Sequence, residues 1–459
     1  MKSREFAYAD VYRHPPVEGD PFDKRGHLAR NDIPAEIAVC CKNESNCTVF
    51  LQDGTWFTTW GQGRAEGHPE EQIVFATSTN RGRTWSEPRV IVASNPEQEE
   101  RIAYGIPFVV PRTDRVYLFF FICALTDGKT WAREGRHDPS TRRYPEHLSG
   151  ILHFMYSDDA GQTWSERYPV ELPPRDVDVI PGRIHGWVNH PPFVMPGKKI
   201  LLTFSASHRI SRRAWQLGAA ENNVVHCANI LTESDPKRLE FHLYPEGPRG
   251  IRANLADNWD NAPLHRLLDF YDGVPEDTGW NYQELTIVPL DDGRWLGVGR
   301  TCLGSPGYTI STDEGRTWTR AERLRYRPGG EHIQHPMTMC PVARMSDGRI
   351  VLLFTNNDGS QRGAQHVWHG EGRTRNPQWF VVGRQMPGVE DNAGLVFGEP
   401  RILAEVDASG QTNLKTGISM PQFFERDGRY FVMYNINKEH ILLDEIPAAV
   451  LDEMTPGRA

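Results

Sequence analysis

Histidine is the residue type in this sequence best suited to proton transfer, because a neutral imidazole near pH 7 can both accept and donate a proton. His185 and His190 lie in the segment RIHGWVNHPPF, His335 lies in HIQHPM, and His68 follows an apolar segment that resembles a hairpin. Any one of the chain's 17 histidines can be an ordinary surface or turn residue. The prediction of a proton-transfer site therefore depends on these four side chains lying close together.

Two arginines and one glutamate could form the charged part of such a site. A guanidinium group is planar and binds a carboxylate, sulfate or phosphate through two parallel hydrogen bonds. Arg300 and Arg362 therefore predict an anionic substrate if they face one cavity, although arginines at strand ends also often pair with loop acids. Glu284 could be the general base or nucleophile of a glycosidase, or it could only orient Arg300. Both interpretations stay open.

An eight-residue pattern that occurs three times indicates which elements must position these residues. The pattern S-x-D-x-G-x-T-W is found at 78–85, 157–164 and 311–318, with Asn80 in place of Asp in the first copy. It predicts a turn between two β-strands: the Asp accepts backbone hydrogen bonds, the Gly adopts a positive φ, and the Trp packs the turn onto its neighbour. We call this turn the Asp-box, and we expect its role to be structural.

A second, looser repeat predicts the number of structural units. Six segments consist of an apolar stretch, a tight turn and a second apolar stretch, and each predicts a two-stranded hairpin. Their turns lie at Gly54, Asp114, Gly197, Gly293, Gly348 and Gly428. One hairpin alone is marginally stable, so six favour a radial arrangement in which each packs on the next. The predicted fold is all-β, a six-bladed β-propeller whose Asp-boxes join the third and fourth strands of their blades.

This architecture predicts which residues surround the central funnel. The tight turns gather on one face, so the opposite face receives the starts of the inner strands and the long loops expected at 122–152, 207–283 and 363–417. Counting back about eight or nine residues from each turn, at ~3.3 Å per residue, locates the six starts. They lie near Ser45, Tyr104, Asn189 or His190, Glu284, Met339, and Ile418 or Ser419. Tyr104 and Asn189 are accordingly predicted to contact substrate.

Asp-boxes on a six-bladed propeller resemble the sialidase (neuraminidase) superfamily, and the resemblance covers roughly 46–435. The family has a glutamate at the start of the fourth inner strand and an arginine at the end of the next strand, and QELTIVPLDDGRWLGVGRT supplies Glu284 and Arg300 there. Arg362 and Arg64 match further family arginines after the fifth and first hairpins. The resemblance implies that these residues bind and act on an acidic sugar.

Several family residues have no counterpart in this chain. The nucleophilic tyrosine of the family opens the sixth inner strand, where this sequence reads TGISM at 416–420. The first arginine of the family's carboxylate-binding triad is expected near 44–47, and none is there. The family has an acid/base aspartate a few residues after the arginine that Arg64 matches, and this chain has no aspartate there. The residues that could substitute for it are Glu66, His68, Glu70 and Glu71. We therefore predict that the protein is not an efficient ordinary sialidase.

The composition excludes several classes of partner. The net charge is −9 and the pI is about 6.0, so no basic field is available for a nucleic-acid backbone. No stretch approaches the ~18 to 20 apolar residues of a transmembrane helix, which predicts no membrane partner. The charged N-terminal sequence lacks the apolar core of a secretion signal, so a cytoplasmic location is expected.

Cofactors and domain organisation can also be predicted. The seven cysteines form no CxxC pair, which argues against a disulfide framework and against a four-cysteine zinc site and predicts buried free thiols. No cofactor is predicted, and a His-containing or oxygen-rich metal site is the weaker alternative. We expect one propeller domain over 1–459, with an N-terminal segment 1–44, blades over 45–435 and a C-terminal tail 436–459. In that tail, ILLDEIPAAVLDEM is predicted to form a short helix.

Three functions compete on this basis. The favoured hypothesis is a glycoside hydrolase acting on a terminal acidic sugar, with Glu284 and one of Glu66, Glu70 or a histidine as acid and base. The second is a lyase, in which a histidine of RIHGWVNHPPF removes the proton beside a uronate carboxylate while Arg300 and Arg362 stabilise the developing charge. The third is a propeller that binds carbohydrate or protein without catalysis, because fold does not fix function. The expected partner is an acidic glycan or oligosaccharide.

Overall fold

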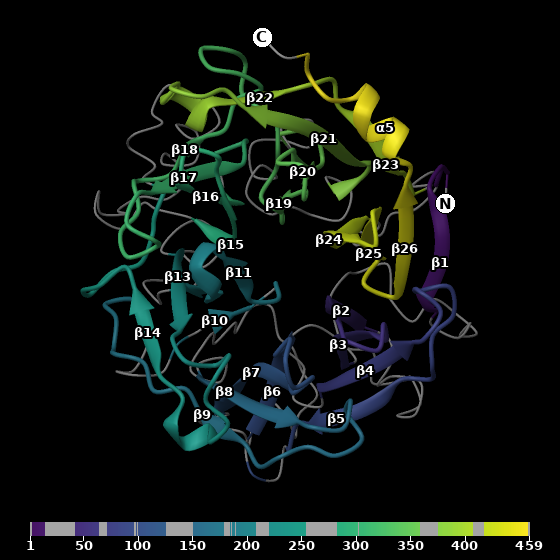
Figure 1. Ribbon diagram of the computed structural model, residues 1–459, viewed down its shortest axis with the longest axis vertical. Helices are drawn as coiled ribbons and strands as arrows, with labels where there is room; N and C mark the ends of the chain where they lie inside the picture. The colour runs from purple at the N-terminus through teal and green to yellow at the C-terminus, as the bar shows by residue number, and fades with distance from the viewer. Residues whose placement is uncertain are drawn as a thin grey trace, which may run out of the picture.

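Six antiparallel β-sheets surround a common centre in this protein (Figure 1). The computed structural model describes residues 2–13, 42–63, 71–95, 98, 100–124, 150–178, 184, 186–188, 190–207, 220–253, 282–301, 303–358, 375–406 and 417–457. Within these residues the chain is almost entirely β-structure. The predicted six-bladed β-propeller is therefore confirmed.

Blades one to five are each built from strands that follow one another along the chain, with the innermost strand first. Blade one contains β2 (Lys42–Phe50), β3 (Trp56–Gly63), β4 (Gln72–Ser78) and β5 (Arg89–Ala93). Blade two contains β6 (Glu100–Val109), β7 (Val116–Ala124), β8 (Gly150–Ser157) and β9 (Tyr168–Pro169). Blade three contains β10 (Gly186–Trp187), β11 (Phe193–Met195), β12 (Lys199–Ser207), β13 (Ala220–Cys227) and β14 (Phe241–Tyr244).

The remaining blades follow the same plan, with the helices outside the sheets. Blade four contains β15 (Gln283–Pro289), β16 (Trp295–Arg300), β17 (Gly307–Ser311) and β18 (Glu322–Arg323). Blade five contains β19 (Val342–Arg344), β20 (Ile350–Phe354), β21 (Gln378–Gln385), β22 (Leu395–Phe397) and β23 (Arg401–Ala404). Blade six contains β24 (Ile418–Arg426), β25 (Arg429–Ile436), β26 (His440–Ile446) and β1 (Ala7–Tyr12). Among the described residues the helices are the 3-10 turns Pro196–Lys198, Pro236–Arg238 and Asp391–Gly394, and α5 (Ala448–Glu453).

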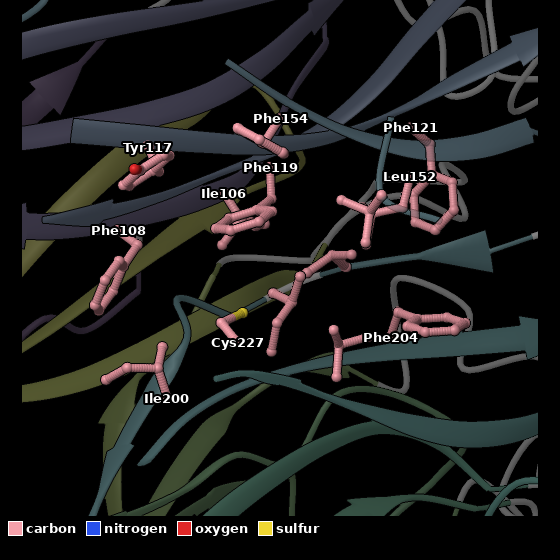
Figure 2. Close-up of a cluster of buried hydrophobic side chains, with 14 of the residues drawn as sticks. Ile106, Phe108, Tyr117, Phe119, Phe121, Leu152, Phe154, Ile200, Phe204 and Cys227 are labelled. Atoms are coloured by element: carbon pink, nitrogen blue, oxygen red, sulfur yellow. The ribbon is translucent and has the colours of Figure 1, made fainter. Parts of the chain in front are cut away.

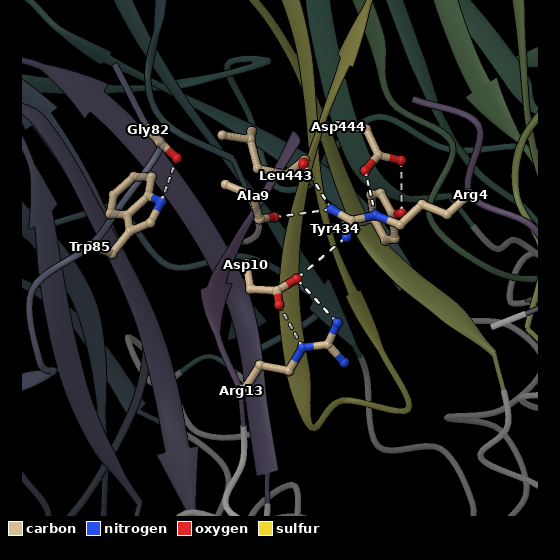
Figure 3. Close-up of polar contacts among 9 residues, drawn as sticks. All are labelled: Arg4, Ala9, Asp10, Arg13, Gly82, Trp85, Tyr434, Leu443 and Asp444. Atoms are coloured by element: carbon tan, nitrogen blue, oxygen red, sulfur yellow. Dashed lines mark hydrogen bonds and ion pairs between the residues drawn. The ribbon is translucent and has the colours of Figure 1, made fainter. Parts of the chain in front are cut away.

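The sixth blade is closed by the N-terminal strand. β1 pairs with β26 as the outermost strand of this sheet. Figure 3 shows the polar contacts that hold it: Arg4 donates to Asp444 at 2.6 Å, and the Tyr434 hydroxyl donates to the same carboxylate at 2.8 Å. The predicted limits 45–435 for the blades are thus wrong at both ends. Strands β1 and β26 are short and lie at or beyond those limits, where no hairpin pattern marked them.

Tight turns gather on one face, as predicted. Neighbouring blades bind one another there: the backbone N–H of Gln52 donates to Asp114 at 3.0 Å, and that of Ser346 donates to Glu425 at 2.8 Å. All three Asp-boxes join the third and fourth strands of their blades. In the second, Asp159 accepts from the Thr163 backbone at 2.8 Å and from its hydroxyl at 2.6 Å. Their tryptophans, Trp85, Trp164 and Trp318, are half-buried rather than buried as expected.

The core lies between the blades, where side chains of adjacent sheets interdigitate. Figure 2 shows the cluster between blades two and three, in which Phe119 packs on Phe154 of the same sheet and Phe121 meets Phe204 of the next edge-on at 6.2 Å. These rings are buried, and burial of one such side chain stabilises the fold by about 1.5–3 kcal/mol. The core therefore joins the sheets into one ring.

Two local predictions need correction, and a third is borne out. The stretches 207–283 and 363–417 were expected to be loops, but they contain β13, β14 and β21 to β23. Of the predicted C-terminal helix only Ala448–Glu453 is helical, because the first part forms β26. Among the described cysteines, Cys47, Cys123, Cys227 and Cys340 are buried and free, as predicted. In the described residues no helix has the length and apolar character required to cross a membrane.

Candidate functional site

A β-bulge recurs near the start of four inner strands and sets the geometry of the funnel mouth. The register shifts at this point in β2, β6, β15 and β24. Each bulge contains a non-glycine residue with positive φ: Ser45 at 55°, Tyr104 at 61°, Glu284 at 54° and Met420 at 52°. Such values are uncommon for residues with a Cβ, and bulges redirect side chains beside functional sites. Three of the four are inner-strand starts named from the sequence, and Met420 directly follows Ser419.

Glu284 and Arg300 meet at this mouth. Arg300, the last residue of β16, donates from Nη1 to Oε1 of Glu284 at 3.1 Å. The Glu284 side chain is 4% exposed and that of Arg300 16%. This contact uses one of five guanidinium N–H groups. In the part of the chain that the structure describes, the buried Nε of Arg300 has no hydrogen-bond partner. The guanidinium therefore keeps donors for a further anion.

Two buried polar residues of blade three hold the backbone of Glu284 in its left-handed conformation. The Ser205 hydroxyl of β12 accepts from the Glu284 backbone N–H at 2.7 Å. Asn222 of β13 accepts from the Leu285 backbone N–H at 3.2 Å and from the Ser205 hydroxyl at 3.2 Å. These bonds supply the partners that a bulge removes from the sheet ladder. The carboxylate is therefore aimed by blade three as much as by its own strand.

His190 lies beside Glu284 in the gap between β10 and β11. A small pocket is lined by Trp187, His190, Thr203, Phe204, Ser205, Glu284 and Leu285. The His190 ring stacks on Phe193 at 5.8 Å and is 9% exposed, and burial lowers its pKa to about 4. Its Nε2 is buried and has no hydrogen-bond partner among the described residues. The imidazole is therefore neutral at pH 7, and Nε2 is its nitrogen without a described partner.

Comparison with known proteins identifies the architecture. Residues 54–228 match the family model of a BNR repeat-like domain. The structure resembles the Hadza microbial sialidase, with a TM-score of 0.55 and 14% identity over 89% of this chain and 66% of that chain. This is the sialidase fold. The chain spans just under two thirds of that sialidase's length.

Two further sialidase-fold structures have similar scores. The NanB sialidase from Streptococcus pneumoniae has a TM-score of 0.56 and 11% identity over 93% of this chain and 71% of that chain. The intramolecular trans-sialidase from Ruminococcus gnavus has a TM-score of 0.54 and 13% identity over 91% of this chain and 96% of that chain. None of the curated proteins matches the sequence. At these identities the likeness establishes the fold, and the chemistry must come from the site.

The sialidase fold here carries an acid where the resemblance led us to expect the first triad arginine. Glu44 lies in the 44–47 stretch of β2 where that arginine was expected, and its carboxylate accepts from Nζ of Lys438 at 2.9 Å. At the start of β24, where the family's tyrosine is expected, the Ser419 hydroxyl donates to Asn435 at 2.7 Å. Blades six and one therefore contribute amides, a hydroxyl and an ion pair to this part of the mouth.

Two residues that the sequence analysis named as site candidates make hydrogen bonds inside the protein instead. His335 is fully buried; its Nε2 lies 3.0 Å from the Thr338 carbonyl and its Nδ1 accepts from the Thr355 backbone N–H at 3.2 Å. Glu71, one substitute for the acid/base aspartate, accepts from the buried Nε of Arg101 at 2.8 Å. We therefore leave both out of the proposed site, because their polar atoms serve internal bonds.

Of the other predicted site residues, the structure describes only Tyr104. Tyr104 is half-buried at the bulge of β6. Six residues lie outside the described ranges: Arg64, Glu66, His68, His185, Asn189 and Arg362. Among the described residues, no three His, Cys, Asp or Glu side chains are placed to hold a metal ion.

Sequence reasoning missed three residues of this site. Trp187 lines the pocket as a half-buried aromatic side chain, and Ser205 and Asn222 support Glu284. Trp187 stands in the same RIHGWVNHPPF segment as the two histidines, so it could have been included. Ser205 and Asn222 carried no signal, because their role depends on contact between blade three and blade four.

Proposed function

We propose that this protein binds a terminal acidic sugar of a glycan at the funnel mouth and hydrolyses its glycosidic bond. The observation that carries the proposal is the Arg300 guanidinium, which is fixed by one hydrogen bond to Glu284 and keeps further donors, including a buried Nε with no partner among the described residues. A desolvated guanidinium of this kind favours a carboxylate or sulfate ligand. The sialidases that share this fold support a glycan ligand.

In this proposal Arg300 binds the acid group and Glu284 acts near the anomeric carbon. A carboxylate beside an oxocarbenium-like transition state can stabilise its positive charge or activate water. A second carboxylic acid is required to protonate the leaving oxygen, and Glu66 is the candidate that the sequence provides. The half-buried Trp187 would offer an apolar surface for a sugar ring.

Elimination from a uronate is the second candidate reaction. The neutral, buried imidazole of His190 favours it. A neutral imidazole with an available nitrogen is a proton acceptor at pH 7, which is the first requirement of a lyase. In that reaction the base takes the proton beside the carboxylate and Arg300 stabilises the charge that develops on it. A protein that only binds the glycan would not need His190 to accept a proton or Arg300 to stabilise a developing charge.

One experiment separates these functions. The protein is incubated with sialosides, uronide oligosaccharides and sulfated oligosaccharides, and both new reducing ends and the ultraviolet absorbance of an unsaturated uronate are recorded. Hydrolysis produces reducing ends alone, whereas elimination produces both signals. The variants Glu284→Gln and Arg300→Ala should abolish or strongly reduce turnover. Arg83→Ala is the matched control, because this exposed arginine lies in an Asp-box on the opposite face. No product with any acidic glycan would contradict catalysis.

A further inference from the structure

The pocket beside Glu284 has a chemical character different from that of Arg300. Its described lining combines the Glu284 carboxylate with the imidazole of His190 and the half-buried ring of Trp187. The Ser205 hydroxyl in the lining already accepts from one backbone N–H and donates to Asn222. His190, one of the lining residues, has a buried Nε2 with no partner in the described part of the chain.

A polar atom of this kind needs a partner. A buried donor or acceptor without a hydrogen bond destabilises the state that contains it, and a molecule that enters the pocket can supply the missing partner. Burial keeps the imidazole neutral, with a pKa of about 4. The ring therefore presents no charge that would attract an anion, and the anionic group of a ligand is left to Arg300.

The required partner is a small neutral group. Nε2 of a neutral imidazole is a donor in one tautomer and an acceptor in the other. A hydroxyl can donate and accept, so it fits both. The cavity volume is about 10 Å³, which is close to the space one water-sized group occupies. Between the described lining residues this space fits one hydroxyl oxygen better than a larger substituent such as an N-acetyl group.

We propose that His190 is a specificity residue that recognises one hydroxyl of the acidic sugar through Nε2, while Arg300 binds the sugar's acid group. The inference rests on the proposed function, because it names the sugar that this site selects. The selected sugar bears a small hydroxyl, rather than an acylated amine, on the side facing blade three. A uronic acid has this pattern of substituents.

Isothermal titration calorimetry tests this assignment with three defined probes, the methyl glycosides of glucuronate, galacturonate and N-acetylneuraminate. His190→Phe retains a ring to stack on Phe193 but removes the nitrogen, and His190→Gln returns an amide nitrogen or oxygen near Nε2. We expect the tightest-binding probe to be a uronate. We expect its Kd to rise about tenfold in His190→Phe, the equivalent of one neutral hydrogen bond, and to recover in His190→Gln.

A series of single-deoxy analogues of that uronate identifies the hydroxyl. One analogue should bind wild type about tenfold more weakly and lose nothing further in His190→Phe, because the two changes remove the same bond. His153→Phe is the matched control: this ring also stacks on a phenylalanine, Phe120 at 6.2 Å, but it lies on β8 beneath the outer strand of blade two. The Kd of the His153→Phe variant for the uronate should equal that of wild type.

The outcomes distinguish this inference from the function on which it rests. If no acidic probe binds, the proposed function fails and the inference with it. If a uronate binds and His190→Phe leaves its Kd unchanged, or if every deoxy analogue loses affinity additively with His190→Phe, the role of His190 is wrong while the function stands. Tighter binding of N-acetylneuraminate than of both uronates would also contradict it.

Discussion

Arg4 and Asp444 are separated by 440 positions in the chain, yet the Nε of Arg4 lies 2.6 Å from the carboxylate of Asp444. The Asp444 side chain is fully buried and that of Arg4 is 12% exposed. Tyr434 donates to the same carboxylate (Figure 3). This ion pair joins the N-terminal segment to the middle strands of the last blade.

Removal of Arg4 should therefore destabilise the fold strongly. Arg4→Ala leaves a buried carboxylate without its cation, and breaking a buried pair in this way costs about 3–5 kcal/mol. Lys2→Ala removes a neighbouring but exposed pair with Glu405 and should cost about 0–1 kcal/mol. Denaturant unfolding of the two variants measures the difference. Equal stabilities would show that β1 does not depend on this pair.

The Asp-boxes should contribute to acid sensitivity. Hydrogen bonds from Thr163 lower the pKa of Asp159 to about 2, and those from Thr317 help lower the pKa of Asp313 against the opposing effect of its partial burial. A lowered folded-state pKa stabilises the protein above the unfolded value of 3.8, and this contribution is lost as pH falls through about 2. Asp159→Asn and Asp313→Asn should therefore weaken the pH dependence of unfolding below pH 4.

The first Asp-box provides the internal comparison for that measurement. Its Asn80 makes the equivalent backbone bond, from Thr84 at 2.9 Å, without a titratable group. Asn80→Asp should add pH dependence in the same range. A stability profile unchanged by all three substitutions would show that these turns do not respond to protonation.

His335 should behave as a structural residue. His335→Leu removes bonds to Thr338 and Thr355 and should lower the unfolding free energy by at least about 1–3 kcal/mol. Burial lowers the pKa of His335 to about 3, so wild-type stability should fall as pH drops below 6.5, where the unfolded state binds a proton. The variant should show less of this fall. A variant with normal stability that has lost sugar binding would instead assign His335 to the ligand site.

Binding of an acidic sugar should depend on the two-pronged guanidinium group of Arg300 and not on its positive charge alone. Arg300→Ala should weaken binding of an acidic sugar by about 1.5–3 kcal/mol, the range for a hydrogen bond to a charged group. Arg300→Lys supplies a point charge that cannot bind bidentately, so only part of the affinity should return. Titration calorimetry with wild type and both variants tests this. Full recovery in Arg300→Lys would argue against a bidentate contact.

Much of the ring could be predicted because its signals are local. Each inner hairpin carries its own turn residue, and the Asp-boxes carry their own glycine and tryptophan. The start of β15 could be located by counting from Gly293, since strands have a fixed rise per residue. Glu284 was found in this way.

The missed elements depend on contacts between blades. β13 contains Glu221, Asn222 and Asn223, all fully buried, and this polar run does not resemble a core strand. Two of the three residues have partners from elsewhere in the chain: Asn222 bonds to β12 and to Leu285 of blade four, and Glu221 accepts from Arg252 at 3.0 Å. The internal role of His335 likewise depends on Thr355, 20 positions away. Periodicity and composition contain no information on such pairings.

The placement of β1 outside β26 has a consequence for how the molecule is made. Blades one to five each form from a continuous stretch, so they can assemble in the order in which the ribosome delivers them. The last blade cannot, because its outer strand is synthesised first and must wait for β24 to β26. Without the sixth blade, blades one and five each lack the neighbour whose side chains pack on them in the complete ring, so the rim of the funnel is complete only once the chain extends to Ile446.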